Sequence, residues 1–340
     1  MVHLRIVAPH ESAGRALELL EASGSVCNVI LMEGAARKPA GDVILCDVAR
    51  EDASVIVDDL RELDIPAQGS IAMEYVDTQI SDAADRAEQH APGLASDAVI
   101  WEDVEHRSQE MTEFSLTFMA FMVLSMLIAA VGILLDQPIL IVGAMVVGPE
   151  FGPLAGLCVA LVEERRPLVK RSLAALGVGF PIGIAVTVLV TLAFRGMGLI
   201  PEDFDPNDHP LTNFISNPDF FSFFVAFVAG VAGVLSLTSS KSGALIGVLI
   251  SVTTIPAAAN VGVASALGEW GEAGGALLQL SINLAAIVLA GVATLYMQRR
   301  FYVSRRRKHL SDPVREAAGL PLGKSSRSVV IGAPPDTRER

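Results

Sequence analysis

Six long apolar segments follow one another through the larger, C-terminal part of this 340-residue chain. About 20 helical residues are needed to cross the roughly 30 Å of hydrocarbon in a bilayer. The apolar content of the segments is too continuous for amphipathic helices of a soluble protein. We therefore expect an α-helical integral membrane protein with six transmembrane helices, at approximately 115–135, 138–162, 172–194, 220–238, 242–267 and 275–297.

The negative charge of the chain is confined to its first part. Residues 1–110 hold 22 Asp and Glu against 8 Lys and Arg; the chain totals of 38 and 25 leave 16 against 17 for the remainder. Such an acidic segment is unsuited to nucleic acid or anionic lipid, so we expect no nucleic-acid partner. Cys27, Cys46 and Cys158 lack metal-ligand spacing, and we predict buried reduced thiols, no metal site and no cofactor.

Basic residues in the connections predict the orientation of the chain. Four Lys or Arg lie in 163–171, six lie in 299–308, and Lys241 follows the fourth segment, whereas the opposite connections hold only Arg195. Lys and Arg accumulate in cytoplasmic loops. We therefore expect a multi-pass protein of the inner (plasma) membrane, with both termini in the cytoplasm and the acidic loop 196–219 outside.

Residues 1–76 have the pattern of a small α+β domain. Strand-like and helical segments alternate in the order β-α-β-β-α-β, which is the ferredoxin-like split motif. We expect a cytoplasmic ferredoxin-like domain. Because one fold hosts many functions, a regulatory role and a role in assembly both remain open.

Three further segments complete the expected organisation. Residues 77–113 form a linker and connecting helix, in which AVIWEDVEHRSQEMTEF (98–114) reads as a helix that runs straight into the first membrane span. Residues 114–298 form the six-helix transmembrane domain. Residues 299–340 form a basic and then disordered cytoplasmic tail.

The second and fifth apolar segments resemble each other. IVGAMVVGPEFGP (141–153) aligns with LIGVLISVTTIPA (245–257) at an offset of 104 residues, which sets Glu150 opposite Thr254 and Gly152 opposite Pro256. Each half would then hold three spans, and since three is odd, the halves would be inverted relative to each other. Inverted repeats with interrupted helices mark transport sites, so we expect a 3+3 inverted repeat.

Glu150 is the only Asp, Glu, Lys, Arg or His within the six apolar segments. It lies twelve residues after Pro138, about 18 Å at helical rise and therefore near the bilayer centre. A carboxylate there should face the bundle interior and is suited to proton exchange or cation binding. The alternative is a structural carboxyl group that hydrogen-bonds the broken helix.

The other candidate site residues are small, proline or neutral polar residues at similar depths. Prolines lack a backbone donor and interrupt helices, and the carbonyl groups they leave free must be satisfied by protein, water or an ion. Glycines four residues apart favour close helix packing, and the amide groups are equally suited to interhelical hydrogen bonds. With Glu150, the predicted solute or ion site comprises Gly148, Pro149, Gly152, Pro153, Thr253, Thr254, Pro256, Asn260 and Asn283.

The core motifs of these segments resemble the DUF389 family of prokaryotic membrane proteins. They are IVGAMVVGPEFGPLAGL (141–157) and SGALIGVLISVTTIPAAANVG (242–262), within a resemblance that covers roughly residues 110–298. Pro149, Gly152, Pro153, Pro256 and Asn283 match the family pattern, but many relatives have an apolar residue where this chain has Glu150. The resemblance supports the architecture and implies no substrate.

We expect a transporter or channel-like protein that moves a small solute or ion through a midplane site formed by interrupted second and fifth spans. Glu150 would couple the movement to a proton or cation, and a homo-oligomer is expected. The alternative is a membrane-anchored ligand sensor or scaffold without flux. An enzyme is not expected, because one carboxylate is thin support for catalysis.

Overall fold

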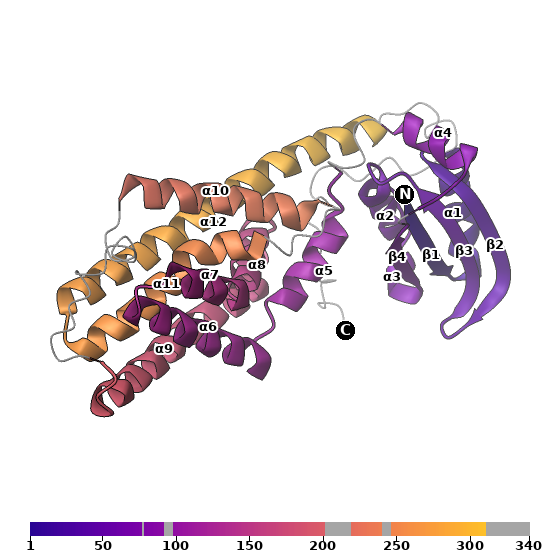
Figure 1. Cartoon of the computed structure of the whole chain (residues 1–340). Coiled ribbons are helices and arrows are strands. Elements are labelled where there is room, and N and C mark those ends of the chain that lie inside the picture. Colours follow the sequence, from indigo (N-terminus) through magenta and orange to yellow (C-terminus); the bar gives the residue numbers. More distant parts are fainter. Residues whose placement is uncertain (77, 92–97, 201–218, 240–245, 311–340) are drawn as a thin grey trace. The chain divides into compact units, whose positions relative to one another are not determined.

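A computed structural model describes residues 1–76, 78–91, 98–200, 219–239 and 246–310, apart from the side chains of residues 246–253 and 304–310. The chain divides into two compact units. The first unit comprises residues 1–103 together with the segment from Gln298 onward, and the second comprises Val104–Met297. Figure 1 labels the helices and strands of both.

The first unit contains a four-stranded antiparallel sheet. Its elements follow the predicted order, β1 (Val2–Ala8), α1 (His10–Ala22), β2 (Val26–Arg37), β3 (Ala40–Val48), α2 (Ala53–Glu62), α3 (Ile65–Gln68), β4 (Ser70–Tyr75) and α4 (Asp82–His90). The strand order is β2-β3-β1-β4, and every described pairing is antiparallel. The short helices α3 and α4 were not predicted.

One face of the sheet packs on α1 and α2. Alternate residues of β1 and β3 enter this core, where Leu4, Ile6, Ile44 and Cys46 are fully buried. The period of two follows from the alternation of side chains along a strand. All three cysteines are free. Burial raises the pKa of the Cys46 thiol to about 12, which keeps it protonated and unreactive.

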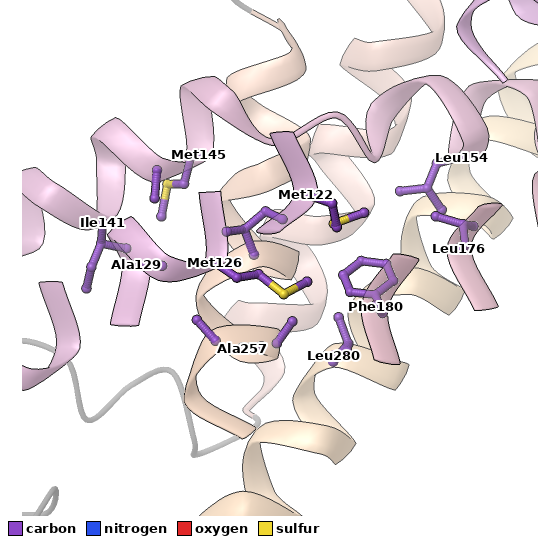
Figure 2. Close-up of a cluster of buried hydrophobic side chains, with 14 of the residues drawn as sticks. Met122, Met126, Ala129, Ile141, Met145, Leu154, Leu176, Phe180, Ala257 and Leu280 are labelled. Carbon is purple, nitrogen blue, oxygen red and sulfur yellow. The ribbon is translucent and has the colours of Figure 1, made fainter. Parts of the chain in front are cut away.

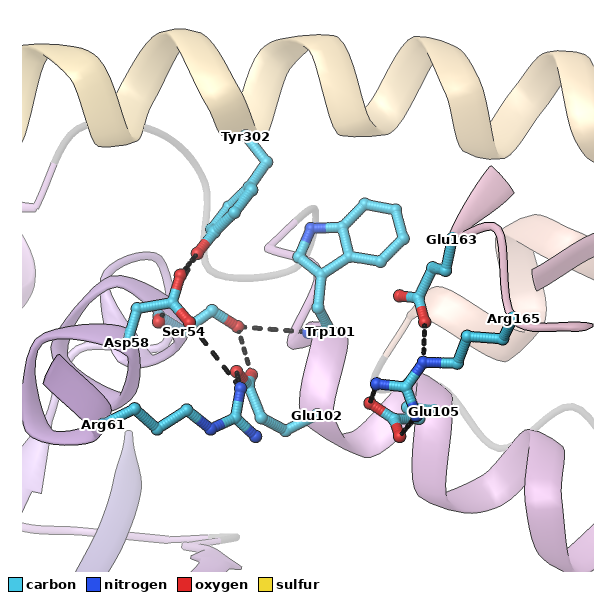
Figure 3. A network of polar contacts seen from close by, with 9 residues as sticks. All are labelled: Ser54, Asp58, Arg61, Trp101, Glu102, Glu105, Glu163, Arg165 and Tyr302. Carbon is cyan, nitrogen blue, oxygen red and sulfur yellow. Dashed lines mark hydrogen bonds and ion pairs between the residues drawn. The ribbon is translucent and has the colours of Figure 1, made fainter. Parts of the chain in front are cut away.

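A network of polar side chains lies beside α2 in the first unit. Ser54 donates to Glu102 (2.7 Å) and accepts from the backbone N–H of Trp101 (3.1 Å), while Arg61 pairs with Glu102 (3.1 Å). Tyr302 donates to Asp58 (2.6 Å), and its ring meets that of Trp101 edge to face (Figure 3). Residues before the first apolar helix and Tyr302, near the end of the last helix, therefore belong to the same unit.

This packing predicts that residues 1–76 are an incomplete folding unit. Ile100 belongs to the core of the sheet, and Glu102 is held by α2. A fragment of residues 1–103 should unfold cooperatively and at a higher temperature than a fragment of residues 1–76, because the shorter one exposes apolar core surface. Thermal circular dichroism compares the two. Equal midpoints would show that the segment after residue 76 adds nothing.

The second unit is a bundle of apolar helices that follows α5 (Trp101–Met111), a helix shared by both units. The helices are α6 (Leu116–Leu134), α7 (Pro138–Val147), α8 (Phe151–Val162), α9 (Arg166–Gly196), α10 (Phe220–Thr238), α11 (Ile246–Leu267) and α12 (Trp270–Leu310), whose residues from Gln298 onward belong to the first unit. Side-chain oxygens cap two of them: Ser115 accepts from the N–H of Phe118, and Asp219 accepts from that of Ser222. Such caps satisfy donors that a helix start leaves open.

The core of the bundle draws on all seven of these helices. Figure 2 shows Met122 and Met126 of α6 close to Phe180 of α9, Ala257 of α11 and Leu280 of α12. The flexible methionine side chains fill the irregular space between the ring and the small residues. This packing holds the helices that carry the candidate site.

One prediction about the connecting helix is wrong. The expected helix from residue 98 to the first span ends at Met111, and α6 begins separately at Leu116. The Thr112 hydroxyl donates to the Ser108 carbonyl, and the Ser115 side chain caps the next helix. These side-chain bonds to backbone groups compete with continuation of the helix.

Candidate functional site

A break divides the second apolar segment at the predicted place. Helices α7 and α8 meet at an angle of 54° across Gly148, Pro149 and Glu150. Gly148 is extended, with φ −60° and ψ 125°, because a residue that precedes proline is disfavoured in the helical region. Glu150 then takes the N-cap position of α8, where its carbonyl accepts from the N–H of Leu154 (3.1 Å).

The carboxylate of Glu150 is buried beside this break. The residue is fully buried, and its Oε1 accepts a hydrogen bond of 2.7 Å from the hydroxyl of Thr254 on α11, which is also fully buried. The break thus brings a carboxylate to a second apolar helix.

Helix α8 packs tightly on the segment that leads to α6. A Cβ atom on Gly152 would collide with the backbone carbonyl of Met111, and one on Gly156 would collide with the hydroxyl of Thr112. The spacing of four residues places both glycines on one helix face. Close packing, which the glycine spacing favoured, is therefore confirmed for Gly152 and Gly156.

An ion-pair network lies at the other end of α8. Arg165 forms a bidentate pair with Glu105 of α5, and its Nε lies 3.3 Å from the carboxylate of Glu163 (Figure 3). Bidentate pairing of guanidinium and carboxylate groups adds geometric specificity to the contact. Together with the two glycines, this network fixes α8 against residues 105–112.

The predicted interruption of the fifth segment is wrong. Helix α11 continues from Ile246 to Leu267 with Pro256 inside it. Ile255, the residue before this proline, is fully buried in the core of the bundle, whereas Gly148 has no side chain to hold it in a helical position. Tertiary packing therefore opposes the local effect of proline in α11 and does not do so in α7.

The remaining candidate residues lie in different surroundings. Pro153 and Pro256 are buried, Gly148 and Pro149 are half-buried, and the side chain of Thr253 lies outside the described residues. Asn260 donates to Glu272 (2.9 Å), and Asn283 accepts from Gln279 (3.4 Å). These hydrogen bonds join α11 to α12 and one turn of α12 to the next. Glu150 and Thr254 are the two predicted polar residues that a described hydrogen bond brings together.

Sequence reasoning missed Glu272 as a membrane-domain carboxylate. The sixth span was expected to begin at residue 275, but α12 begins at Trp270 and Glu272 occupies its first turn. An acidic residue is favourable in a first turn, and this was the available signal. Among the described residues, no group of three or more His, Cys, Asp or Glu side chains is placed to hold a metal ion.

The helices define a multi-pass membrane protein. In the described part of the chain, four helices are long and apolar enough to cross a membrane, α6, α9, α10 and α12, and the bent pair α7–α8 makes a fifth span if counted as one. The buried carboxylate thus lies between helices of the membrane domain.

Comparison with known proteins agrees with this class. Residues 145–289 match the family described as "Domain of unknown function (DUF389)", so the resemblance is confirmed over this segment. An uncharacterized protein of Methanocaldococcus jannaschii is 25% identical over 242 residues, which cover 71% of this chain and 72% of the relative. No solved structure matches the chain.

Proposed function

We propose that this protein moves a small solute or ion across the membrane through a site at Glu150. One observation carries the proposal: a fully buried carboxylate sits at a break in an apolar helix and is hydrogen-bonded to a second apolar helix. Ionisable groups inside membrane domains are expensive, and they typically mark ion pathways. A helix break adds backbone groups that bind ions or polar solutes.

The proposed membrane domain has six spans arranged as a 3+3 inverted repeat. Helix α11 has 22 residues, which is about 33 Å at helical rise and long enough to cross a membrane; with the five spans above it would bring the number to six. The two positions that the sequence alignment sets opposite each other, 150 and 254, are in hydrogen-bond contact. This contact supports the repeat.

The first unit is proposed to be a ferredoxin-like domain that regulates or assembles the complex. The alternative function is a ligand sensor without flux, and the Tyr302–Asp58 hydrogen bond favours it. A ligand bound to this unit would act on a residue near the end of the last apolar helix. In both cases we propose a homo-oligomer of the inner membrane.

A ligand screen separates the two functions. Purified full-length protein and the 1–103 fragment would be tested for thermal stabilisation by the same panel of inorganic ions and small metabolites. Ligands that bind the native state raise its unfolding temperature. Transport predicts a ligand that stabilises the full chain and leaves the fragment unchanged. A ligand that stabilises the fragment equally would favour the sensor.

The basic connections support a topology in which the start of α9 is cytoplasmic and its end lies outside. Arg165, Arg166, Lys170 and Arg171 surround the start of α9, whereas Arg195 is at its end. We expect a cysteine introduced at Pro167 to be protected from a membrane-impermeant thiol reagent in intact cells, and a cysteine at Met197 to be labelled. Both positions are exposed, so accessibility is matched. The reverse labelling pattern would overturn the orientation.

A further inference from the structure

Contacts between the membrane helices recur at a constant offset of 104 residues. A Cβ atom on Gly262 of α11 would lie 2.7 Å from Cγ2 of Thr187 on α9. A Cβ atom on Gly291 of α12 would lie 2.7 Å from Sγ of Cys158 on α8. Adding 104 to 158 gives 262, and adding 104 to 187 gives 291. The two contacts are therefore the same contact with the halves exchanged.

The neighbouring contacts obey the same offset. The Cβ position of Gly262 is 3.2 Å from the carbonyl of Ile184, and Sγ of Cys158 donates to the carbonyl of Val288 at 3.8 Å. Residue 288 is 184 plus 104, so this pair of contacts is reciprocal as well. Two close approaches between helices thus use equivalent backbone positions in each half.

Contacts within each half also correspond. Gly183 of α9 packs closely against Met126 of α6, and a Cβ atom on Gly230 of α10 would lie 2.7 Å from the carbonyl of Ile287 on α12. The differences 230 − 126 and 287 − 183 are both 104. In the first half the larger residue, Met126, is on α6 and the glycine is on α9. In the second half the glycine, Gly230, is on α10 and the larger residue, Ile287, is on α12, so each pair still joins a large residue to a glycine.

The buried face of α10 is that of α6 shifted by the same offset. Six of the seven residues given as buried in α10 match buried residues of α6: Ala226, Ala229, Gly230, Gly233, Val234 and Leu237 correspond to Met122, Ser125, Met126, Ala129, Ala130 and Ile133. Outward positions match too, since Leu124 is 50% exposed and Val228 48%. Equivalent faces therefore point into the bundle in both halves.

We propose that a two-fold pseudosymmetry axis passes through the Glu150–Thr254 pair, so that Thr254 is the second half's equivalent of Glu150 in one shared site. A two-fold operation exchanges partners, as it does at a symmetric dimer interface, and the reciprocal contacts Thr187–Gly262 and Cys158–Gly291 have this property. Only positions close to such an axis touch their own equivalents. Residues 150 and 254 differ by 104 and are hydrogen-bonded at 2.7 Å.

The axis itself is inferred from the contacts alone, and only its role in transport rests on the proposed function. If the protein is a transporter, an axis through the site presents it equivalently to both membrane faces, as alternating access around a fixed site requires. One half supplies the carboxylate and the broken helix, and the other supplies the hydroxyl and the unbroken helix. The two halves then contribute equivalent positions to the site but different chemical groups.

Distances between spin labels test the axis directly. Labels would be attached in pairs at Leu124, Leu173, Val228 and Leu277, four outward positions of which the last two are the first two plus 104, with exposed fractions between 48% and 53%. The full-length chain would carry Ala at its three native cysteines and be diluted with unlabelled protein. Double electron–electron resonance then gives distances 124–277 and 228–173 across the halves, and 124–173 and 228–277 within them.

The axis predicts that the 124–277 and 228–173 distance distributions match each other, and that the 124–173 and 228–277 distributions match each other. Equal distances within the halves together with unequal distances across them would mean a repeat without a two-fold axis and would overturn the proposal. Unequal distances within the halves would overturn the repeat itself. A protein without flux in reconstituted vesicles would remove the transport proposal and leave these distances unaffected, so the two failures are distinguishable.

Discussion

Glu150→Gln is expected to fold and assemble as the original chain does, and to lose the part of the pH or cation response of its thermal stability that Glu150 contributes. Glutamine keeps the shape of the side chain and accepts the Thr254 hydroxyl, which lies 2.7 Å from the carboxylate. It removes the negative charge that a cation or proton would neutralise. The measurement is the unfolding temperature of both purified proteins across a pH series and with alkali cations.

A matched pair of threonine variants controls for damage to packing. Thr254 and Thr187 are both fully buried, but the Thr187 hydroxyl donates to the carbonyl of Gly183 in its own helix. Thr254→Val should lower stability by about 1–3 kcal/mol, because it removes a hydrogen bond from a buried carboxyl group, and it should alter the pH or cation response. Thr187→Val should leave that response unchanged. Parallel responses of Glu150→Gln and the original chain would reduce Glu150 to a structural residue.

Gly152→Ala is expected to destabilise the membrane domain strongly. The added Cβ atom would collide with the backbone carbonyl of Met111, and backbone cannot move aside as a flexible side chain does. Overpacking of this kind costs about 1–3 kcal/mol or more. The measurement is the thermal unfolding of purified protein in detergent, together with the yield of monodisperse material.

Gly143→Ala is the control for this prediction. Gly143 lies in α7, within the same bent pair of helices, and a Cβ atom there meets nothing within 4 Å. Alanine should therefore be tolerated and can gain up to about 1 kcal/mol from its higher helix propensity. Equal stability of the two variants would mean that α8 does not pack on Met111 as described.

Local sequence rules predicted the parts of this structure that local forces determine. The apolar helices follow from the length that a bilayer imposes, and the alternation in β1 and β3 follows from strand geometry. The break after Val147 follows from Gly148 and Pro149, since the residue before proline leaves the helical region. These features need no knowledge of distant contacts.

Two features that sequence reasoning missed depend on distant contacts. Pro256 carries the same local signal as Pro149, yet Ile255 is packed in the core and α11 stays helical. Alignment of residues 150 and 254 indicated equivalent positions in two halves. The alignment could not show that their side chains are hydrogen-bonded, because that depends on how the helices pack.

Flux measured in proteoliposomes tests the proposal that Glu150 forms an ion or solute site within the membrane domain. The original chain and Glu150→Gln would be reconstituted at equal density beside protein-free vesicles, and influx of protons and of alkali cations would be followed with entrapped indicator dyes over a pH series. We expect flux above the protein-free level that depends on pH or cation for the original chain, and loss of that dependence for the variant. Identical curves for the two proteins would contradict the proposal.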